Sequence, residues 1–193
     1  MGHLILNSNY SRFSVQFEKG FFPDTVRTKY RRLINATPDI FQEIEDLVEF
    51  SIQGITIPEL NAGTVAQSPS QSSWERVKKS GKDILQLEDG NRHLTIKFKY
   101  VDNFLNYFAC RELLIDYWRY GDKKNVEFLP SIYLNILDRN GYIVLQYRFC
   151  HIIMTRIDSF DLSYTSNVTE FRSFNVDFTY NYYDIIDYSN INS

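Results

Sequence analysis

The sequence is poor in the residues that most often carry chemistry, with two cysteines, three histidines and five prolines among 193 residues. Both cysteines, Cys110 and Cys150, lie in apolar stretches, where a free thiol behaves as a small hydrophobic side chain. We therefore expect two buried, reduced thiols, although the residues alone leave a disulfide open. The scarcity of proline predicts few low-complexity linkers.

Motifs for catalysis and metal binding are also missing. The histidines, His3, His93 and His151, do not have the spacing of a metal-binding pair. The sequence contains no C-x-x-C, no phosphate-binding loop and no G-x-S-x-G or G-x-G-x-x-G motif. Asp158 and Asp161 lie in a turn-rich stretch, where aspartate commonly bonds to the backbone. We expect no enzyme, cofactor or metal; a hydrolase using clustered acids is the weaker alternative.

Strong charge and long apolar runs are absent as well. The formal net charge is −3, which argues against a tight grip on nucleic acid phosphates. No apolar run approaches the length of about 20 residues that spans a bilayer, and the opening "MGHLILNSNY" lacks the charged start of a signal peptide. We expect a soluble protein made inside the cell.

Hydrophobic and aromatic residues are abundant, at 44% and 16% of the chain. Aromatic enrichment is typical of β-rich proteins, and the length suits one domain over residues 1–193. Alternation of apolar and polar residues predicts strands, at 11–17, 46–58, 92–102, 131–138, 141–149 and 172–185. The pair Asn140-Gly141 predicts a hairpin between two of them.

The last predicted strand divides most cleanly into two faces. Its apolar face is Phe174, Val176, Phe178, Tyr180 and Tyr182. Its polar face is Ser173, Asn175, Asp177, Thr179 and Asn181. Such a strand buries one face in the core and exposes the other to water. The polar face is either a sheet surface open to solvent or the lining of an enclosed space.

Two helices interrupt the strands. The strong one spans 102–121 and has a broad apolar face, so it should cover an open face or end of the sheets. A short one at 35–47 has Thr37 as its cap and Pro38 in its first turn. The polar stretch 59–73 predicts a loop. We expect a mainly β fold, an antiparallel sandwich or barrel with one long packed helix and a short N-terminal helical insertion at about 21–46.

Three stretches resemble the tail tube superfamily of contractile-tailed bacteriophages, which includes major tube proteins, baseplate tube-initiator proteins and the tube protein of type VI secretion. They are "VEFSIQGITIPEL", the strand–helix unit Leu94–Trp118, and "ILDRNG" with the strands that follow it. Together they span about two thirds of the chain. The segment Phe21–Asp46 departs from the family pattern as an insertion.

The resemblance implies a ring of six subunits whose sheets join into a barrel, with polar faces lining a channel. The expected channel-lining residues are Glu49, Ser51, Gln53, Ser173, Asn175, Asp177, Thr179 and Asn181. Lys97 and Lys99 fit this less well and are expected toward a sheath or a ring edge. The expected contacts to partners are Asn61, Gln67, Trp74, Lys78 and Lys79.

The function so implied is that of a structural virion protein, a tail tube or baseplate initiator subunit, assembled in the host cytoplasm. Its partners would be further copies of itself and neighbouring tube, baseplate, sheath or tape-measure proteins, with DNA passing unbound and no membrane involved. One alternative is the tube of a contractile injection system. Another is an OB-like nucleic-acid-binding module, which needs a basic aromatic face. Residues 74–82 are the one candidate for such a face.

Overall fold

The structure is a computed structural model that describes residues 12–34, 43–57, 64–67, 79–82, 92–101, 104–124, 127–160 and 173–188, with the backbone alone at 32–34, 64–67, 79–82 and 120–124. The helices are α1 (Asp24–Ile34), α2 (Ile44–Phe50) and α3 (Leu105–Lys124). The strands are β1 (Phe13–Phe17), β2 (Ile52–Thr56), β3 (Thr64–Gln67), β4 (Lys79–Lys82), β5 (His93–Lys99), β6 (Ile132–Leu137), β7 (Ile143–Cys150), β8 (Ile153–Ile157), β9 (Ser173–Thr179) and β10 (Tyr182–Asp187).

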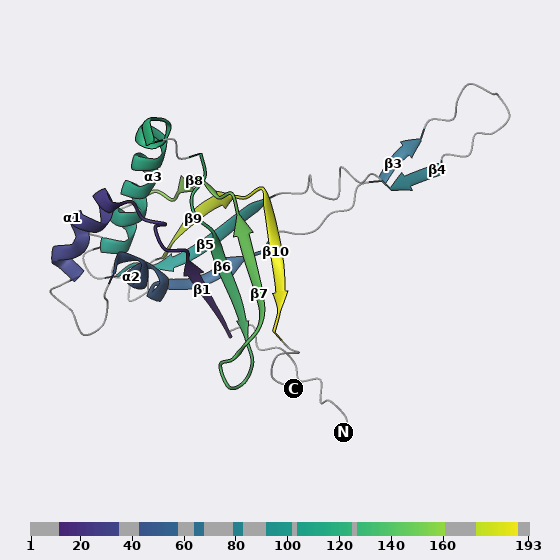
Figure 1. The fold of residues 1–193 in the computed structure, drawn as a ribbon, viewed down its shortest axis with the longest axis horizontal. Helices are drawn as coiled ribbons and strands as arrows, with labels where there is room; N and C mark the ends of the chain where they lie inside the picture. Colours follow the sequence, from purple (N-terminus) through teal and green to yellow (C-terminus); the bar gives the residue numbers. More distant parts are fainter. Residues whose placement is uncertain are drawn as a thin grey trace, which may run out of the picture.

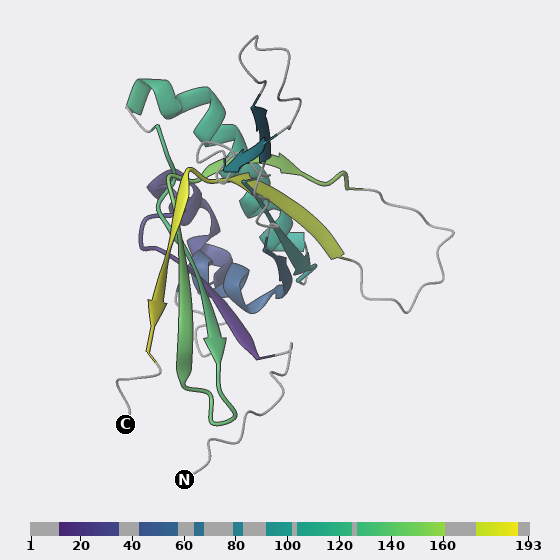
Figure 2. The same ribbon diagram turned by 90° about the vertical axis from the view of Figure 1, so that its right-hand side faces the viewer.

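Two four-stranded antiparallel sheets make up the body of the protein. One has the order β1-β6-β7-β10 and the other the order β2-β5-β9-β8. The strands of the first sheet run across those of the second in Figure 1, and the three helices gather on one side of the pair. Figure 2 shows β10, β7, β6 and β1 fanned out in that order. This is a β-sandwich with crossed sheets, which confirms the predicted fold class.

The core lies between the two sheets and is built by the predicted alternation. On β5 and β9, every second residue is buried, and Phe98 stacks on Phe174 with ring centroids 5.2 Å apart. The opposite sheet contributes the buried residues Val15, Phe17, Ile132, Leu134 and Phe149. Burial of these side chains, at roughly 1.5–3 kcal/mol each, is the main term that holds the sheets together.

Helix α3 confirms the long predicted helix and seals the core. Tyr107, Ala109 and Leu113 are buried. The helix is tied to β5 by Asn106, whose Nδ2 donates to the Lys99 carbonyl at 2.6 Å and whose Oδ1 accepts from the Val101 N–H at 3.2 Å. Cys110 on the same helix and Cys150 on β7 are free and buried, as expected. Burial raises the pKa of the Cys110 thiol to about 12, so the thiol stays protonated near neutral pH.

The N-terminal third differs from the prediction. Residues 24–34 form α1, and 44–50 form α2, whereas a helix was expected at 35–47 and a strand from Asp46. Residues 35–42 lie outside the described part of the chain. Glu43 and Asp46 form a capping box that starts α2. Ile44, Leu47 and Val48 then give it a buried face at helical spacing. The strand begins only at Ile52.

The closing strand is two strands in different sheets, not one. β9 ends at Thr179 and pairs with β5 and β8, while β10 starts at Tyr182 and pairs with β7. Tyr180 is buried at the corner, but Tyr182 is 48% exposed. The expectation that Tyr182 belongs to the core face is therefore wrong, because the chain changes sheets between the two tyrosines.

The polar stretch 59–73 is not loop throughout. Its residues Thr64–Gln67 form β3, which pairs with β4 and sets Gln67 opposite Lys79. Both are expected partner contacts, and Figure 1 shows this hairpin well apart from the two large sheets. The other expected contacts, Asn61, Trp74 and Lys78, lie outside the described residues. Among the described helices, none is both long and apolar enough to cross a membrane.

Candidate functional site

The outer face of the β1-β6-β7-β10 sheet carries a chain of uncharged polar side chains. We call it the amide face and define it by Ser14, Gln16, Asn135 and Gln146. Register places Ser14 opposite Asn135 and Asn135 opposite Gln146, so the three side chains share one side of the sheet. Asn135 has no exposed surface although it points away from the core.

Hydrogen bonds join the amide face across neighbouring strands. Asn135 Nδ2 donates to Ser14 Oγ and to Gln16 Oε1, both at 3.2 Å, and Asn135 Oδ1 accepts from Gln146 Nε2 at 2.7 Å. The Tyr188 hydroxyl extends the chain to Gln146 at 3.4 Å. Since the donors and acceptors of these side chains hydrogen-bond to one another, the amide face is polar and neutral, and its hydrogen bonds are already made.

Charged groups border the amide face at one end. The Arg148 guanidinium lies 5.7 Å from the Tyr133 ring centroid, and its Nε donates to Ser131 Oγ at 3.3 Å. The Glu18 carboxylate accepts the Ser131 N–H at 2.8 Å. Hydrogen bonding by Ser131, backbone first, lowers the pKa of Glu18. Glu18 is therefore held as a carboxylate beside Arg148.

The outer face of β9 carries four of the eight expected channel-lining residues, Ser173, Asn175, Asp177 and Thr179. Asp177 Oδ1 accepts from Thr95 Oγ1 at 2.7 Å, and Asp158 Oδ2 accepts from Asn175 Nδ2 at 2.9 Å. Register also places Lys97 opposite Asn175 and Arg156 opposite Asp177. This face is therefore charged with both signs, unlike the amide face.

The other four expected residues do not share that face. Glu49 is on α2, where its Oε1 accepts the Phe17 N–H at 2.6 Å. Burial is the main cause of a raised pKa for Glu49. Ser51 is buried and closes the helix by donating its hydroxyl to the Val48 carbonyl at 2.7 Å. Gln53 is exposed at a bulge of β2, and Asn181 is exposed at the corner between β9 and β10.

The expectation that Glu49, Ser51 and Gln53 alternate on one strand is thus wrong, because Glu49 lies in α2 and Ser51 is the C-cap of that helix. The amide face was missed at the sequence level. Its only local signal is the polar alternation of Ser14 and Gln16 in the first strand. Within the described residues, no group of three or more histidine, cysteine, aspartate or glutamate side chains is placed to hold a metal ion.

No family model matches the chain, and no curated protein matches it by sequence. By structure, it is similar to the tube terminating cap of the anti-feeding prophage, with a TM-score of 0.55 and 10% identity over 97% of this chain and 95% of that one. It is also similar to a chain of the sheath/tube terminator of PVC, an extracellular contractile injection system, with a TM-score of 0.51 and 8% identity over 95% and 99% of the two chains.

A chain of the PVC sheath–tube complex matches with a TM-score of 0.50 and 10% identity over 95% of this chain and 94% of that one. The protein shares its fold with these cap, terminator and sheath–tube chains. The resemblance drawn from the sequence is thereby confirmed for the fold. The neighbours named here are components of a tube complex, a terminator and a cap.

Proposed function

We propose that this protein is a ring-forming subunit of the tube of a contractile injection system, in which six copies enclose a channel. One observation carries the proposal. The likeness to the prophage cap covers 97% of this chain and 95% of the other, so it extends over nearly the full length of both and is not confined to a shared module. Such long coverage supports a role in the same kind of assembly.

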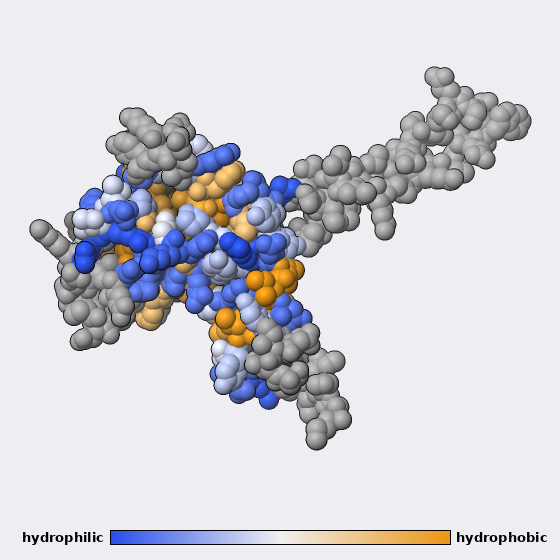
Figure 3. Space-filling view, viewed as in Figure 1, coloured by the Kyte–Doolittle hydropathy of each residue, from blue (hydrophilic) through white to orange (hydrophobic). Residues whose placement is uncertain are grey.

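The β1-β6-β7-β10 sheet offers a way to close the ring. β1 and β10 are its two outer strands, and each pairs with one strand of the sheet. Because the sheet has four antiparallel strands, β10 of one copy and β1 of the next run in opposite directions and extend the same antiparallel ladder. A barrel closed in this way leaves no sheet edge exposed. Ile185 and Ile186 on β10 are 52% and 39% exposed. They supply apolar surface that the joint between β10 of one copy and β1 of the next can bury. Apolar patches interrupt the hydrophilic surface in this region of the sheet in Figure 3.

The amide face is the surface that best suits the channel. None of its four members is charged, and its amides are already bonded to one another, so it offers cargo few strong contacts. Arg148 and Asp184 lie on the same side of the sheet, toward the end that carries Glu18. A channel that passes nucleic acid must avoid basic side chains, because each lysine or arginine that binds phosphate strengthens retention. The β9 face, with Lys97 and Arg156 beside its polar residues, is the second candidate for the lining.

Electron microscopy of the purified chain, backed by sedimentation velocity, tests the ring. We expect closed rings or stacked tubes with an open centre, and a chain that stays monomeric at high concentration contradicts the proposal.

Ser14→Cys and Asn175→Cys then show which face lines the channel. A small maleimide should label both variants, whereas a polymer-linked maleimide too large for the channel should label only Asn175→Cys in assembled rings. The native cysteines are 4% and 5% exposed, which keeps background labelling low. The reverse pattern assigns the channel to the β9 face.

A further inference from the structure

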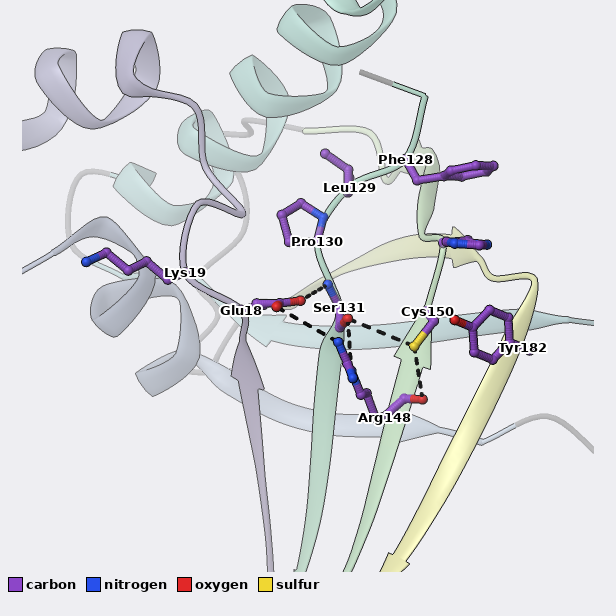
Figure 4. Close-up of a pocket in the computed structure, with 10 residues that line it drawn as sticks. Glu18, Lys19, Phe128, Leu129, Pro130, Ser131, Arg148, Cys150 and Tyr182 are labelled. Carbon is purple, nitrogen blue, oxygen red and sulfur yellow. Dashed lines mark hydrogen bonds and ion pairs between the residues drawn. The ribbon is translucent and has the colours of Figure 1, made fainter. Parts of the chain in front are cut away.

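A pocket of about 440 Å³ opens at one end of the β1-β6-β7-β10 sheet. It lies where β1 ends, β6 begins, β7 ends and β10 begins. Figure 4 shows Glu18, Ser131, Arg148 and Cys150 at its base and Phe128 and Tyr182 at its side. The pocket is beyond the end of the amide face. Of the residues that line it, Tyr182 alone belongs to a strand of the proposed joint between copies, as the first residue of β10.

Aromatic rings form one wall of this pocket. The Phe128 ring stacks on the His151 ring, with centroids 4.6 Å apart and planes at 19°. Tyr182 meets the same His151 ring edge-on, with centroids 5.1 Å apart and planes at 84°. His151 is held at the corner after β7 with a φ of 55°. Such a wall favours a flat aromatic guest, which gains roughly 0.5–1.5 kcal/mol beyond area burial per ring pair.

The base of the pocket provides hydrogen-bond donors. A guanidinium has five N–H groups, and Arg148 uses its Nε on Ser131 Oγ. Its Nη2 lies 4.0 Å from Glu18 Oε1, which is beyond hydrogen-bond distance. The terminal N–H groups of Arg148 therefore remain available to an acceptor such as a phenol oxygen. Aromatic walls above a cation with free donors match the chemistry of a tyrosine side chain.

A tyrosine of this description stands at the opposite end of the same sheet. Tyr142 lies in the β6–β7 turn and is 64% exposed. Asp138 Oδ1 accepts from the N–H groups of Asn140 and Tyr142, at 2.7 and 2.8 Å, and fixes the turn. Gly141 adopts a φ of 87°, which a glycine takes without strain. The turn thus presents Tyr142 on a rigid tip.

The pocket and the tip of one chain cannot meet. They are separated by β7, which has 8 residues, and a strand rises about 3.3 Å per residue, so the ends lie roughly 26 Å apart. In a closed barrel the strands run along the axis with a tilt of roughly 35–45°. The pocket and the tip would then lie on opposite faces of a ring. Complementary patches on opposite faces make a head-to-tail contact that repeats from copy to copy.

We infer that Tyr142 of one copy inserts into the Phe128–Arg148–His151 pocket of a second copy, in the next ring. The inference rests on the proposed ring and adds the contact that stacks one ring on another. The proposed occupant is a second copy of this chain, because the chain carries both the pocket and a matching exposed tyrosine, at the two ends of one sheet. The spacing of rings along the tube would follow from the length of that sheet.

Cross-linking between two full-length variants tests the contact. Arg139→Cys, in the same turn as Tyr142, and Lys19→Cys, at the rim of the pocket, leave the proposed contact intact; they are purified separately, mixed and treated with a short bis-maleimide. We expect a cross-linked dimer in the mixture, at a yield at least tenfold above that of either variant alone. Lys79→Cys, on β4, replaces Arg139→Cys in a matched control, and little product is expected. Tyr142→Ser should abolish stacking in sedimentation velocity while single rings remain, and Tyr142→Phe, which keeps the ring and loses the phenol oxygen, should only weaken it.

Each outcome decides a different point. Rings seen by electron microscopy without the 139–19 product overturn the inference and leave the proposed function standing. Monomers without the product overturn both. A product formed with Lys79→Cys instead identifies the β3–β4 hairpin of a neighbour as the occupant and also overturns the inference. The 139–19 product in open chains without closed rings supports the contact between Tyr142 and the pocket and contradicts the ring.

Discussion

At the scale of single residues, two glutamates near the end of β1 take opposite roles. Glu18 accepts the Ser131 N–H, and this hydrogen bond lowers the pKa of Glu18. Glu49 accepts the Phe17 N–H, but burial raises the pKa of Glu49, and the nearby carboxylates of Asp46 and Glu45 add to that rise. Both carboxylates hold backbone in place, yet their charge acts on stability in opposite directions.

Glu49→Gln should change the pH dependence of stability. A raised folded-state pKa means that Glu49 favours the fold at low pH and that this contribution is lost as pH rises through the folded pKa, above the ordinary 4.5. Glutamine stays neutral and can still accept the Phe17 N–H. The variant should therefore gain free energy of unfolding, relative to the natural chain, as pH rises above the ordinary 4.5, measured in urea titrations.

Glu18→Gln serves as the comparison for that experiment. A lowered folded-state pKa gives stability that is present above the unfolded pKa and is lost as pH falls through the folded pKa. The Glu18 variant should therefore be the less stable protein near neutrality and approach the natural chain in acid. If both variants respond to pH in the same direction, the assigned causes of the two shifts are wrong.

At the scale of elements, the β8 edge of the β2-β5-β9-β8 sheet depends on side chains that tie one strand to the next. The clearest tie is Asp158, which follows β8 and accepts from both the N–H and the Nδ2 of Asn175 on β9, at 3.0 and 2.9 Å. Asp158→Ala leaves these donors without their acceptor. We expect a loss of about 1–3 kcal/mol in the free energy of unfolding, measured in urea. Asp184→Ala, at an exposed position on β10, should change it by less than about 0.5 kcal/mol.

The outer strand β10 makes a separate prediction about assembly. Ile185 is 52% exposed, so Ile185→Lys should change the free energy of unfolding by less than about 0.5 kcal/mol. In the ring it would place a charge in an apolar joint, which is strongly unfavourable. We therefore expect rings to be lost in sedimentation velocity while the monomer stays folded. Ile57→Lys, at a position 44% exposed beside β2, is the matched control and should still form rings.

At the scale of the whole molecule, a net charge of −3 and a neutral amide face favour passage of cargo over capture. Gln16→Lys adds one positive charge per copy to that face. Rings of this variant should bind single-stranded DNA several-fold more tightly than natural rings at low salt, with the difference shrinking as salt rises. Fluorescence anisotropy measures the change. Thr28→Lys adds the same charge on α1, away from the face, and a response equal to that of Gln16→Lys would remove the amide face from the channel.

The sequence by itself determined the elements whose pattern is local. Period-two alternation predicted β1, β5, β6 and β7, the Asn140-Gly141 pair predicted the β6–β7 hairpin, and the apolar face of 102–121 predicted α3. These features need only neighbouring residues, because side-chain direction within a strand or helix is set by the backbone repeat.

Tertiary structure alone decided where the closing strand breaks and which polar residues meet. Alternation over 172–185 is the same for one long strand and for β9 and β10 in two sheets, so only packing against β5 and β7 separates them. Residues 46–50 became helix because the buried Ile44, Leu47 and Val48 outweighed the alternation. Asn135 found Ser14 and Gln146 through register, 121 and 11 residues away. Cross-strand partners, unlike strand faces, depend on contacts distant in sequence, and no local pattern encodes them.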